Sequence, residues 1–250
     1  MVTLKKSLGQ HFLTDLNICR KITGSLPQAA FGRLLEVGPG GGALTKFLLE
    51  LPVHEFKAVE VDDEKVQYLT RTFPQLEHKL VHASFLDIEP PFSGPFYIVG
   101  NFPYNISTQI LFKVLDWPGL VTGVTGMFQK EVAQRVAAPE GSRVYGVTSV
   151  LLQAFFDIEY LFEVHENCFN PPPKVKSAVI RLTPKEQPPA IRSRALFFLL
   201  VKTAFNQRRK TLRNAVKNLF ETNVLADDIF NKRAEQLSVN DFAQLSFKMK

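Results

Sequence analysis

Short, mostly apolar runs recur along the first part of the chain, at residues 33–37, 56–61, 79–84 and 96–100. Stretches with helical spacing separate them, and another follows Ser107. Runs of this length are typical of buried strands, whereas the intervening segments have the period of amphipathic helices. Strands that alternate with helices predict a parallel, doubly wound α/β sheet.

The later part of the chain has a different pattern. Residues 127–136 leave a fifth strand and enter a helix, residues 145–156 are a further apolar helical stretch, and residues 177–182 form another strand. The proline-rich segment 183–189 is the one clear linker, and the chain after it is helical, with a helix expected over residues 209–220. We therefore expect an α/β domain over residues 1–184 and a small helical domain over residues 185–250.

The first strand leads into a glycine-rich turn. Gly38, Gly40 and Ala43 follow the spacing of nucleotide-binding loops, in which glycines let the backbone approach a ligand and a helix N-terminus points at it. The next strand ends near Glu60, 22 positions after Gly38, where a carboxylate can accept both hydroxyls of a ribose. Oxidoreductases and methyltransferases share this pattern. Glu36 favours S-adenosylmethionine over a dinucleotide, because a carboxylate beside the loop repels a pyrophosphate but tolerates a sulfonium and an amino group.

A rigid corner follows the strand at residues 96–100. Pro103 fixes its own φ and pushes Phe102 toward an extended conformation, so the backbone carbonyls there keep one direction. Asn101 adds an amide and Tyr104 adds a flat ring. Together they fit a planar amine, such as the exocyclic amine of a nucleobase. An ordinary strand-to-helix turn with a satisfied asparagine is the alternative interpretation.

Two other segments carry candidate residues. Three consecutive prolines at 171–173 make a stiff arm that could hold Phe169 over the corner, and a plain loop with a core phenylalanine is the alternative. His11 stands alone near the N-terminus, and an isolated histidine is more often structural than catalytic.

Charge separates the two expected domains. The 250-residue chain carries a net charge of +6, but residues 187–220 contain eight Lys or Arg and no Asp or Glu, which leaves about −2 for the rest. Arg209, Arg213 and Lys217 recur every four residues. Solvated helices normally mix charges for pairing, so a basic face without acids indicates a polyanionic partner, nucleic acid before an anionic membrane surface.

Composition excludes several classes of protein. The longest apolar run, residues 195–201, is far shorter than the roughly 20 residues of a membrane span. The N-terminus lacks an apolar signal core, and Cys19 and Cys168 lack metal or redox spacing. We expect a soluble cytoplasmic protein with no membrane partner and no metal site.

With these residues in view, the chain closely resembles the small-subunit (16S) ribosomal RNA adenine dimethyltransferase family. The resemblance covers nearly the whole chain and follows the family's motifs in order. These motifs are Gly9–Leu13, Glu36–Gly40, Asn101–Ser107, Phe128–Val132, Phe169–Val175 and Phe205–Thr211. The last is the most specific, because many methyltransferases share glycine loops.

The resemblance implies a class I methyltransferase (Rossmann-like) domain with a mostly parallel seven-stranded sheet, followed by a basic, all-helical RNA-binding domain. It implies two methyl transfers from S-adenosylmethionine to N6 of each of two adjacent adenosines near the 3′ end of 16S rRNA, in the small ribosomal subunit or its precursor. A monomer is expected. The expected cofactor-binding residues are His11, Leu13, Glu36, Gly38, Gly40, Glu60, Ser84 and Asn101. The expected catalytic residues are Asn101, Pro103, Tyr104 and Phe169, and the expected RNA-binding residues are Arg208, Arg209, Lys210, Arg213 and Lys217.

Two positions depart from the family pattern. Ser84 stands where the family usually has an Asp that contacts the adenine amino group of the cofactor, with Asp87 three positions later. We expect the Ser84 hydroxyl or a backbone amide to replace that carboxylate, and Asp87 to point elsewhere. Phe102 stands where the family often has Leu.

Three other functions stay open at this point. A large-subunit rRNA adenine methyltransferase shares the corner but is expected to lack the proline arm and the Arg208-Arg209-Lys210 signature. A non-catalytic ribosome-assembly or transcription factor would tolerate loss of Asn101 or the loop glycines, and all of these are intact. A nicotinamide oxidoreductase would have no use for the corner or the basic segment.

Overall fold

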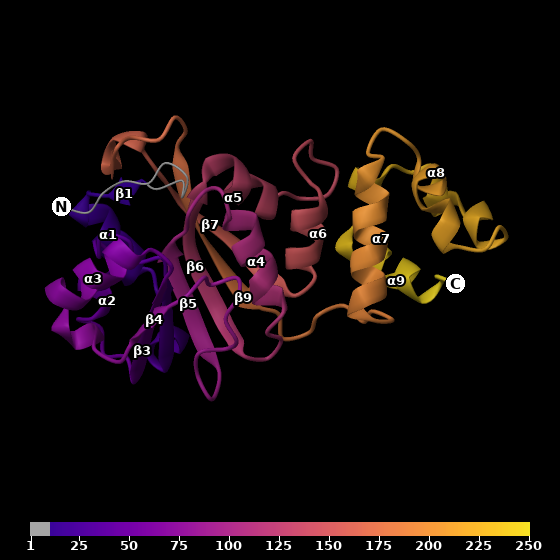
Figure 1. The fold of residues 1–250 in the computed structure, drawn as a ribbon. Helices are drawn as coiled ribbons and strands as arrows, with labels where there is room; N and C mark the ends of the chain where they lie inside the picture. Colours follow the sequence, from indigo (N-terminus) through magenta and orange to yellow (C-terminus); the bar gives the residue numbers. More distant parts are fainter. Residues whose placement is uncertain (1–10) are drawn as a thin grey trace. The chain divides into compact units, whose positions relative to one another are not determined.

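The computed structural model describes residues 11–250, whose fold is shown in Figure 1. Chain contacts divide it into two compact units. Unit 1 comprises the chain up to residue 133 together with residues 159–184, and unit 2 comprises residues 134–158 and 185–250. The chain does pass from unit 1 to unit 2 after residue 184, where the domain boundary was expected. Residues 134–158 also belong to unit 2, which was not expected. That unit 1 binds the cofactor and unit 2 binds RNA stays a prediction.

Seven strands form one sheet in the order β4-β3-β2-β5-β6-β9-β7 (Figure 1). The five parallel strands are β2 (Arg33–Val37), β3 (Glu55–Glu60), β4 (Leu80–His82), β5 (Phe96–Asn101) and β6 (Val121–Gln129). β9 (Ser177–Pro184) runs antiparallel to β6, and β7 (Phe156–Val164) lies at the edge. The predicted mostly parallel, seven-stranded α/β sheet is confirmed. A separate pair, β1 (Phe12–Leu13) and β8 (Phe169–Asn170), was not expected.

Helices connect the strands and form most of unit 2. They are α1 (Leu16–Gly24), α2 (Thr45–Leu48), α3 (Asp63–Thr72), α4 (Ser107–Leu115), α5 (Lys130–Val136), α6 (Val147–Gln153), α7 (Arg194–Asn206), α8 (Leu212–Val216) and α9 (Val239–Phe247). Short 3₁₀ turns are η2 (Gln28–Phe31), η3 (Pro74–Leu76), η4 (Glu166–Cys168), η5 (Lys217–Leu219), η6 (Val224–Ala226), η7 (Asp228–Asn231) and η8 (Ala234–Gln236). Within residues 11–250, every helix is too short or too polar to cross a lipid bilayer.

The helix expected over residues 209–220 is wrong. α8 covers only Leu212–Val216, and a turn closed by the Lys210 N–H and the Gln207 carbonyl precedes it. Thr211 forms an isolated bridge with Arg233, and the Leu212 N–H donates to the Lys232 carbonyl at 2.7 Å. These contacts to a distant segment take over backbone groups that a continuous helix would use.

The core of unit 1 explains why its strands are almost wholly apolar. β2 and β5 are buried over nearly their whole length, as expected for strands covered on both faces. One cluster joins Ile22 of α1 and Ala30 of η2 to Leu34, Ala58 and Val99 on the sheet. Burial of such side chains stabilises the fold by about 1.5–3 kcal/mol for each large one.

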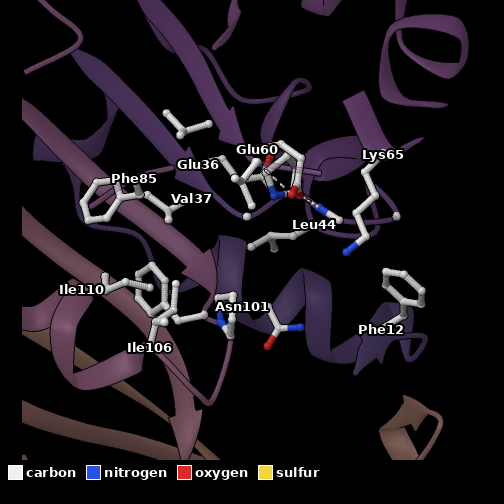
Figure 2. A pocket seen from close by; sticks show the side chains of 18 of the residues that line it. Phe12, Glu36, Val37, Leu44, Glu60, Lys65, Phe85, Asn101, Ile106 and Ile110 are labelled. Atoms are coloured by element: carbon white, nitrogen blue, oxygen red, sulfur yellow. Dashed lines mark hydrogen bonds between the residues drawn. The ribbon is translucent and has the colours of Figure 1, made fainter. Parts of the chain in front are cut away.

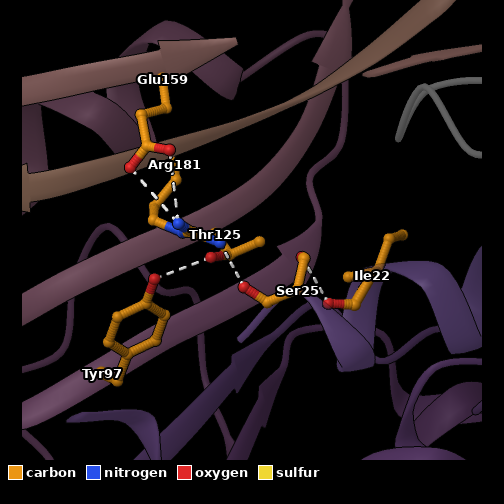
Figure 3. Close-up of polar contacts among 6 residues, drawn as sticks. All are labelled: Ile22, Ser25, Tyr97, Thr125, Glu159 and Arg181. Atoms are coloured by element: carbon orange, nitrogen blue, oxygen red, sulfur yellow. Dashed lines mark hydrogen bonds and ion pairs between the residues drawn. The ribbon is translucent and has the colours of Figure 1, made fainter. Parts of the chain in front are cut away.

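Polar contacts attach the end of α1 to the sheet (Figure 3). Arg181 of β9 donates to the Ser25 carbonyl and lies 3.3 Å from the Glu159 carboxylate. The Ser25 hydroxyl donates in turn to the Ile22 carbonyl at 2.7 Å. α1 is thereby fixed at its C-terminal end, and Asp15 caps its other end by accepting two backbone N–H groups.

Candidate active site

A cavity of about 490 Å³ opens at the carboxyl ends of the parallel strands. The strand order reverses between β2 and β5, because the chain first proceeds outward to β3 and β4 and then returns. Ligands of doubly wound folds bind at such a point. The cavity wall contains all of the residues expected to bind the cofactor, and three of the four expected to be catalytic. These are His11, Leu13, Glu36, Gly38, Gly40, Glu60, Ser84, Asn101, Pro103 and Tyr104.

The glycine loop after β2 is held by the carboxylate at the end of β3. Glu60, labelled in Figure 2, accepts the Gly40 N–H through Oε2 at 3.0 Å, and its Oε1 accepts the N–H groups of Val61 and Asp62 at 3.0 and 3.1 Å. Gly40 has φ +57, and a Cβ there would lie 3.4 Å from the Phe12 ring. Its lack of a side chain therefore serves the left-handed backbone, while a Cβ would only reach ordinary contact with β1.

Glu36 is the most unusual polar group of the cavity. Its residue is only 1% exposed, and Oε2 has no hydrogen-bond partner among the residues that the structure describes. Burial raises the pKa of this carboxyl from 4.5 to about 8; the Thr45 hydroxyl partly offsets this rise, and the Glu60 carboxylate adds to it. A buried oxygen of this kind is costly unless a donor or a cation reaches it.

The corner after β5 orients one amide. Asn101 Nδ2 donates to the His11 carbonyl at 3.3 Å, which leaves Oδ1 as an acceptor at the cavity. The His11 ring donates through Nδ1 to the Pro171 carbonyl at 2.9 Å. Its ring centroid lies 5.4 Å from that of Tyr104. His11 thus supports both Asn101 and Tyr104.

Tyr104 presents its ring to the cavity while its hydroxyl is hydrogen-bonded to Ser177 at the start of β9. Burial raises the pKa of the Tyr104 phenol, and the hydrogen bond with Ser177 opposes that rise. Because the hydroxyl is anchored and stays neutral, the ring is available for stacking and not for proton transfer.

Phe102 turns its side chain into the core. The residue is 1% exposed, and its ring centroid lies 4.9 Å from that of Phe128. A Cβ on Gly126 would come within 2.1 Å of the Phe102 ring, and one on Gly100 within 2.9 Å. The ring therefore fills a space that two glycines leave between β5 and β6. Phe102 also lies in the cavity wall, between Asn101 and Pro103.

Ser84 and Asp87, at the other departure from the family pattern, differ in their position relative to the cavity. Ser84 lines the cavity, and its hydroxyl accepts the Leu86 N–H at 3.3 Å. Asp87 is exposed and is not among the lining residues. A role of Ser84 toward a cofactor stays a prediction.

Phe169 is not brought to the cavity. It is 3% exposed and belongs to the core cluster of unit 1. The reason is the pairing of β8 with β1, in which Leu13 faces Phe169. The expectation that Phe169 covers the slot is therefore corrected: the proline arm attaches the N-terminal segment, and the ring packs inward.

Sequence analysis missed some of the cavity wall. Lys65 of α3 lines the cavity, is 3% exposed and lies 5.1 Å above the Phe12 ring. Phe12 and Phe85 also line it. A lysine in the first turns of an acidic helix gives no signal of burial in the sequence. Within residues 11–250, no group of three or more His, Cys, Asp or Glu side chains could hold a metal ion.

The expected RNA-binding residues of unit 2 differ in their surroundings. Arg208 donates to the carbonyls of Ser142 and Arg143, at 3.5 and 2.6 Å, and lies 3.8 Å from the Glu235 carboxylate. Arg213 Nε donates to the Leu225 carbonyl at 3.0 Å. Both side chains thus stabilise unit 2 itself. The other three residues, Arg209, Lys210 and Lys217, are exposed.

Comparisons with known proteins show the family of this chain. The sequence model of the family described as ribosomal RNA adenine dimethylase matches residues 1–248. A ribosomal RNA small subunit methyltransferase A from Cytophaga hutchinsonii is 51% identical, over 98% of this chain and 96% of the relative. The protein of the same name from Phocaeicola vulgatus is also 51% identical, over 98% of this chain and 89% of the relative.

Solved structures show the same architecture. A dimethyladenosine transferase from Plasmodium falciparum superposes with a TM-score of 0.79 at 25% identity, over 94% of this chain and 96% of the other. The 23S rRNA methyltransferase ErmE gives a TM-score of 0.74 at 22% identity, over 95% and 99%, which supports the class I methyltransferase fold alone. From the family match and the close relatives together, this chain belongs to the ribosomal RNA adenine dimethylase family.

Proposed function

We propose that the protein uses S-adenosylmethionine to dimethylate N6 of two adjacent adenosines near the 3′ end of 16S rRNA. It is an rRNA adenine dimethyltransferase by family, and its close relatives are named small subunit methyltransferases. The observation that most directly supports a catalytic role is the orientation of Asn101, whose side-chain nitrogen donates a hydrogen bond to the His11 carbonyl. The oxygen of the amide is then the group that meets a substrate amine.

The residues present fit the cofactor. S-adenosylmethionine, when bound, supplies a methyl group carried on a sulfonium. Glu60 would accept a ribose hydroxyl, since a carboxylate has about four acceptor sites and three are used by the loop N–H groups. Gly38 and Gly40 leave the loop backbone open, and Glu36 offers a cationic ligand a buried oxygen that no residue of the described chain hydrogen-bonds.

The chain's part in the reaction is to hold the amine. The N6 lone pair is delocalised into the adenine ring, so the amine is a poor nucleophile. Asn101 Oδ1 and the carbonyl of Phe102 or Pro103 would accept its hydrogens and favour a tetrahedral nitrogen aimed at the methyl group for in-line displacement. This stabilises developing charge with fixed dipoles. Tyr104 would stack on the extruded base. Because Phe169 packs in the core, base stacking rests on Tyr104 alone in this arrangement.

The basic part of unit 2 would bind the rRNA backbone. Arg209, Lys210 and Lys217 are exposed and offer their charges to phosphates, while Arg208 and Arg213 also hold neighbouring loops. We further propose that the protein acts as a cytoplasmic monomer.

Mass spectrometry of rRNA nucleosides tests the proposal. The protein is incubated with radiolabelled S-adenosylmethionine and undermethylated small subunits, with large subunits in parallel. Labelled N6,N6-dimethyladenosine in 16S rRNA alone is expected. Label in 23S rRNA would favour a large-subunit methyltransferase, and label in neither would favour a non-catalytic assembly factor.

A further inference from the structure

One oxygen of Glu36 has no hydrogen-bond partner within residues 11–250, and the fold gives no reason for burying it there. Glu60, its neighbour across β2 and β3, holds the glycine loop through three backbone N–H groups. Glu36 Oε2 lacks such a partner among the described residues, although the residue is 1% exposed and lines the cavity. Figure 2 shows the two carboxylates close together at the same cavity.

The groups around Glu36 come from three elements. β3 contributes the Glu60 carboxylate, α2 the Thr45 hydroxyl and α1 the Cys19 thiol, while Lys65 of α3 lines the same cavity with its Nζ over the Phe12 ring. Burial raises the pKa of the Cys19 thiol to about 11, so this group is neutral at pH 7. Burial, and to a smaller extent the Glu60 charge, raise the pKa of the Glu36 carboxyl to about 8, against the opposing effect of the Thr45 hydroxyl. It is mostly neutral at pH 7 when no ligand is bound.

We propose that Glu36 carries a proton in the ligand-free protein and releases it when a cationic group of S-adenosylmethionine enters the cavity, so that cofactor binding is coupled to proton release. The O–H bond of the carboxyl breaks, the proton passes to solvent, and the carboxylate is left facing the cation. This inference rests on the cofactor assigned under the proposed function. The cofactor offers two cations, its ammonium and its sulfonium, and S-adenosylhomocysteine keeps only the first.

The coupling predicts how the affinity for S-adenosylmethionine depends on pH. A cation lowers the pKa of Glu36 in the complex, so the complex binds fewer protons than the free protein, and affinity rises with pH. The rise is about tenfold per pH unit between pH 6 and 7 and levels off near pH 8, where the free carboxyl ionises. Glu36→Gln keeps the shape of the side chain and cannot ionise.

Isothermal titration calorimetry of the full chain tests the inference. S-adenosylmethionine is titrated at pH 7 in two buffers of different ionisation enthalpy, which gives the number of protons released. Wild type is expected to release close to one proton more per cofactor than Glu36→Gln, because the variant corrects for protons of the cofactor itself. Equal proton counts for the two proteins would overturn the inference.

Two further measurements make the result independent of the variant's folding. Wild-type affinity that stays constant from pH 6 to 8 would also overturn the coupling. The thermal stability of ligand-free wild type is expected to fall from pH 5 to 8 more than that of Glu36→Gln, since the unfolded carboxyl ionises near 4.5 and the folded one near 8. Identical pH profiles of stability would count against a protonated Glu36.

S-adenosylhomocysteine identifies the cation. Proton release with both ligands means that Glu36 faces the ammonium, and release with S-adenosylmethionine alone means that it faces the sulfonium; either result supports the inference. A wild type that binds no S-adenosylmethionine at any pH would refute the proposed function itself, whereas normal binding without the extra proton refutes only this coupling.

Discussion

Replacing Asn101 with Ala separates the chemical role of its amide from its structural role. In the structure the side chain makes one hydrogen bond, from Nδ2 to the His11 carbonyl at 3.3 Å. Loss of a single bond of this kind costs about 0.5–1.5 kcal/mol of stability. Loss of a group that stabilises developing charge costs about 2.7–4 kcal/mol, or roughly 10²–10³ in the rate of methyl transfer. The effect on the rate is therefore expected to exceed the effect on folding.

The assay is single-turnover methyl transfer to undermethylated small subunits, with cofactor and RNA both saturating. Calorimetric affinity for S-adenosylmethionine and urea-induced unfolding are measured on the same preparation. Asn17→Ala is a matched control, because Asn17 is exposed on α1 and outside the cavity. Methyl transfer by Asn101→Ala at the wild-type rate would refute the role of the amide oxygen.

Asn101→Asp tests the orientation argument. A carboxylate keeps an acceptor for the substrate amine but loses the donor to His11 and places negative charge beside that carbonyl. An intermediate rate, above that of the Ala variant, is expected. A rate equal to that of Asn101→Ala would mean that the His11 contact, and not the free oxygen, carries the effect.

Three further predictions address the cofactor loop and the RNA contact. Glu60→Ala should weaken S-adenosylmethionine binding by about 1.5–3 kcal/mol. Glu60→Gln should weaken it by less, because the amide oxygen can still accept one loop N–H. Equal calorimetric affinity of wild type and Glu60→Ala would point to another ribose partner. Ser84→Asp should tighten cofactor binding in the same measurement, by restoring a carboxylate at a cavity-lining position, and weaker binding would show that this position does not meet the adenine. Replacing Arg209 and Lys210 together by Gln should weaken rRNA binding and flatten the slope of log affinity against log salt by about 1.5 to 2, with methyl transfer preserved at saturating RNA. An unchanged slope in filter-binding titrations would mean that these two side chains do not contact the rRNA backbone.

Sequence patterns predicted the parts of the site that depend on neighbours along the chain. The glycine loop, the acid at the end of β3 and the proline corner each need only a strand, a turn and a few fixed residue types. Their meeting at one cavity followed from parallel strand order, and the structure has that order. For this reason most of the candidate cofactor residues could be named in advance.

The errors concern contacts between distant segments. α8 begins late because Thr211 and Leu212 bond to residues about 20 positions away, and no local signal marks that pairing. Phe169 turns inward because β8 pairs with β1, more than 150 residues earlier. The sequence predicts that Arg208 is available to bind RNA. In the structure, two carbonyls of a preceding loop accept its guanidinium hydrogens.

The packing of Phe102 restricts the order in which substitutions can accumulate in this lineage. With the ring in place, Gly126→Ala would force a Cβ to within 2.1 Å of it, so that step is blocked while position 102 remains aromatic. Phe102→Leu, taken first, leaves a void at some cost in stability and removes the nearer obstacle to a methyl group on Gly126, although the Phe128 ring, 2.8 Å from that Cβ, would still have to shift. The same two changes are therefore less damaging when Phe102→Leu comes first than when Gly126→Ala comes first. The corner at Phe102 offers its backbone carbonyl to the cavity, and its side chain restricts which residues β6 can carry at position 126.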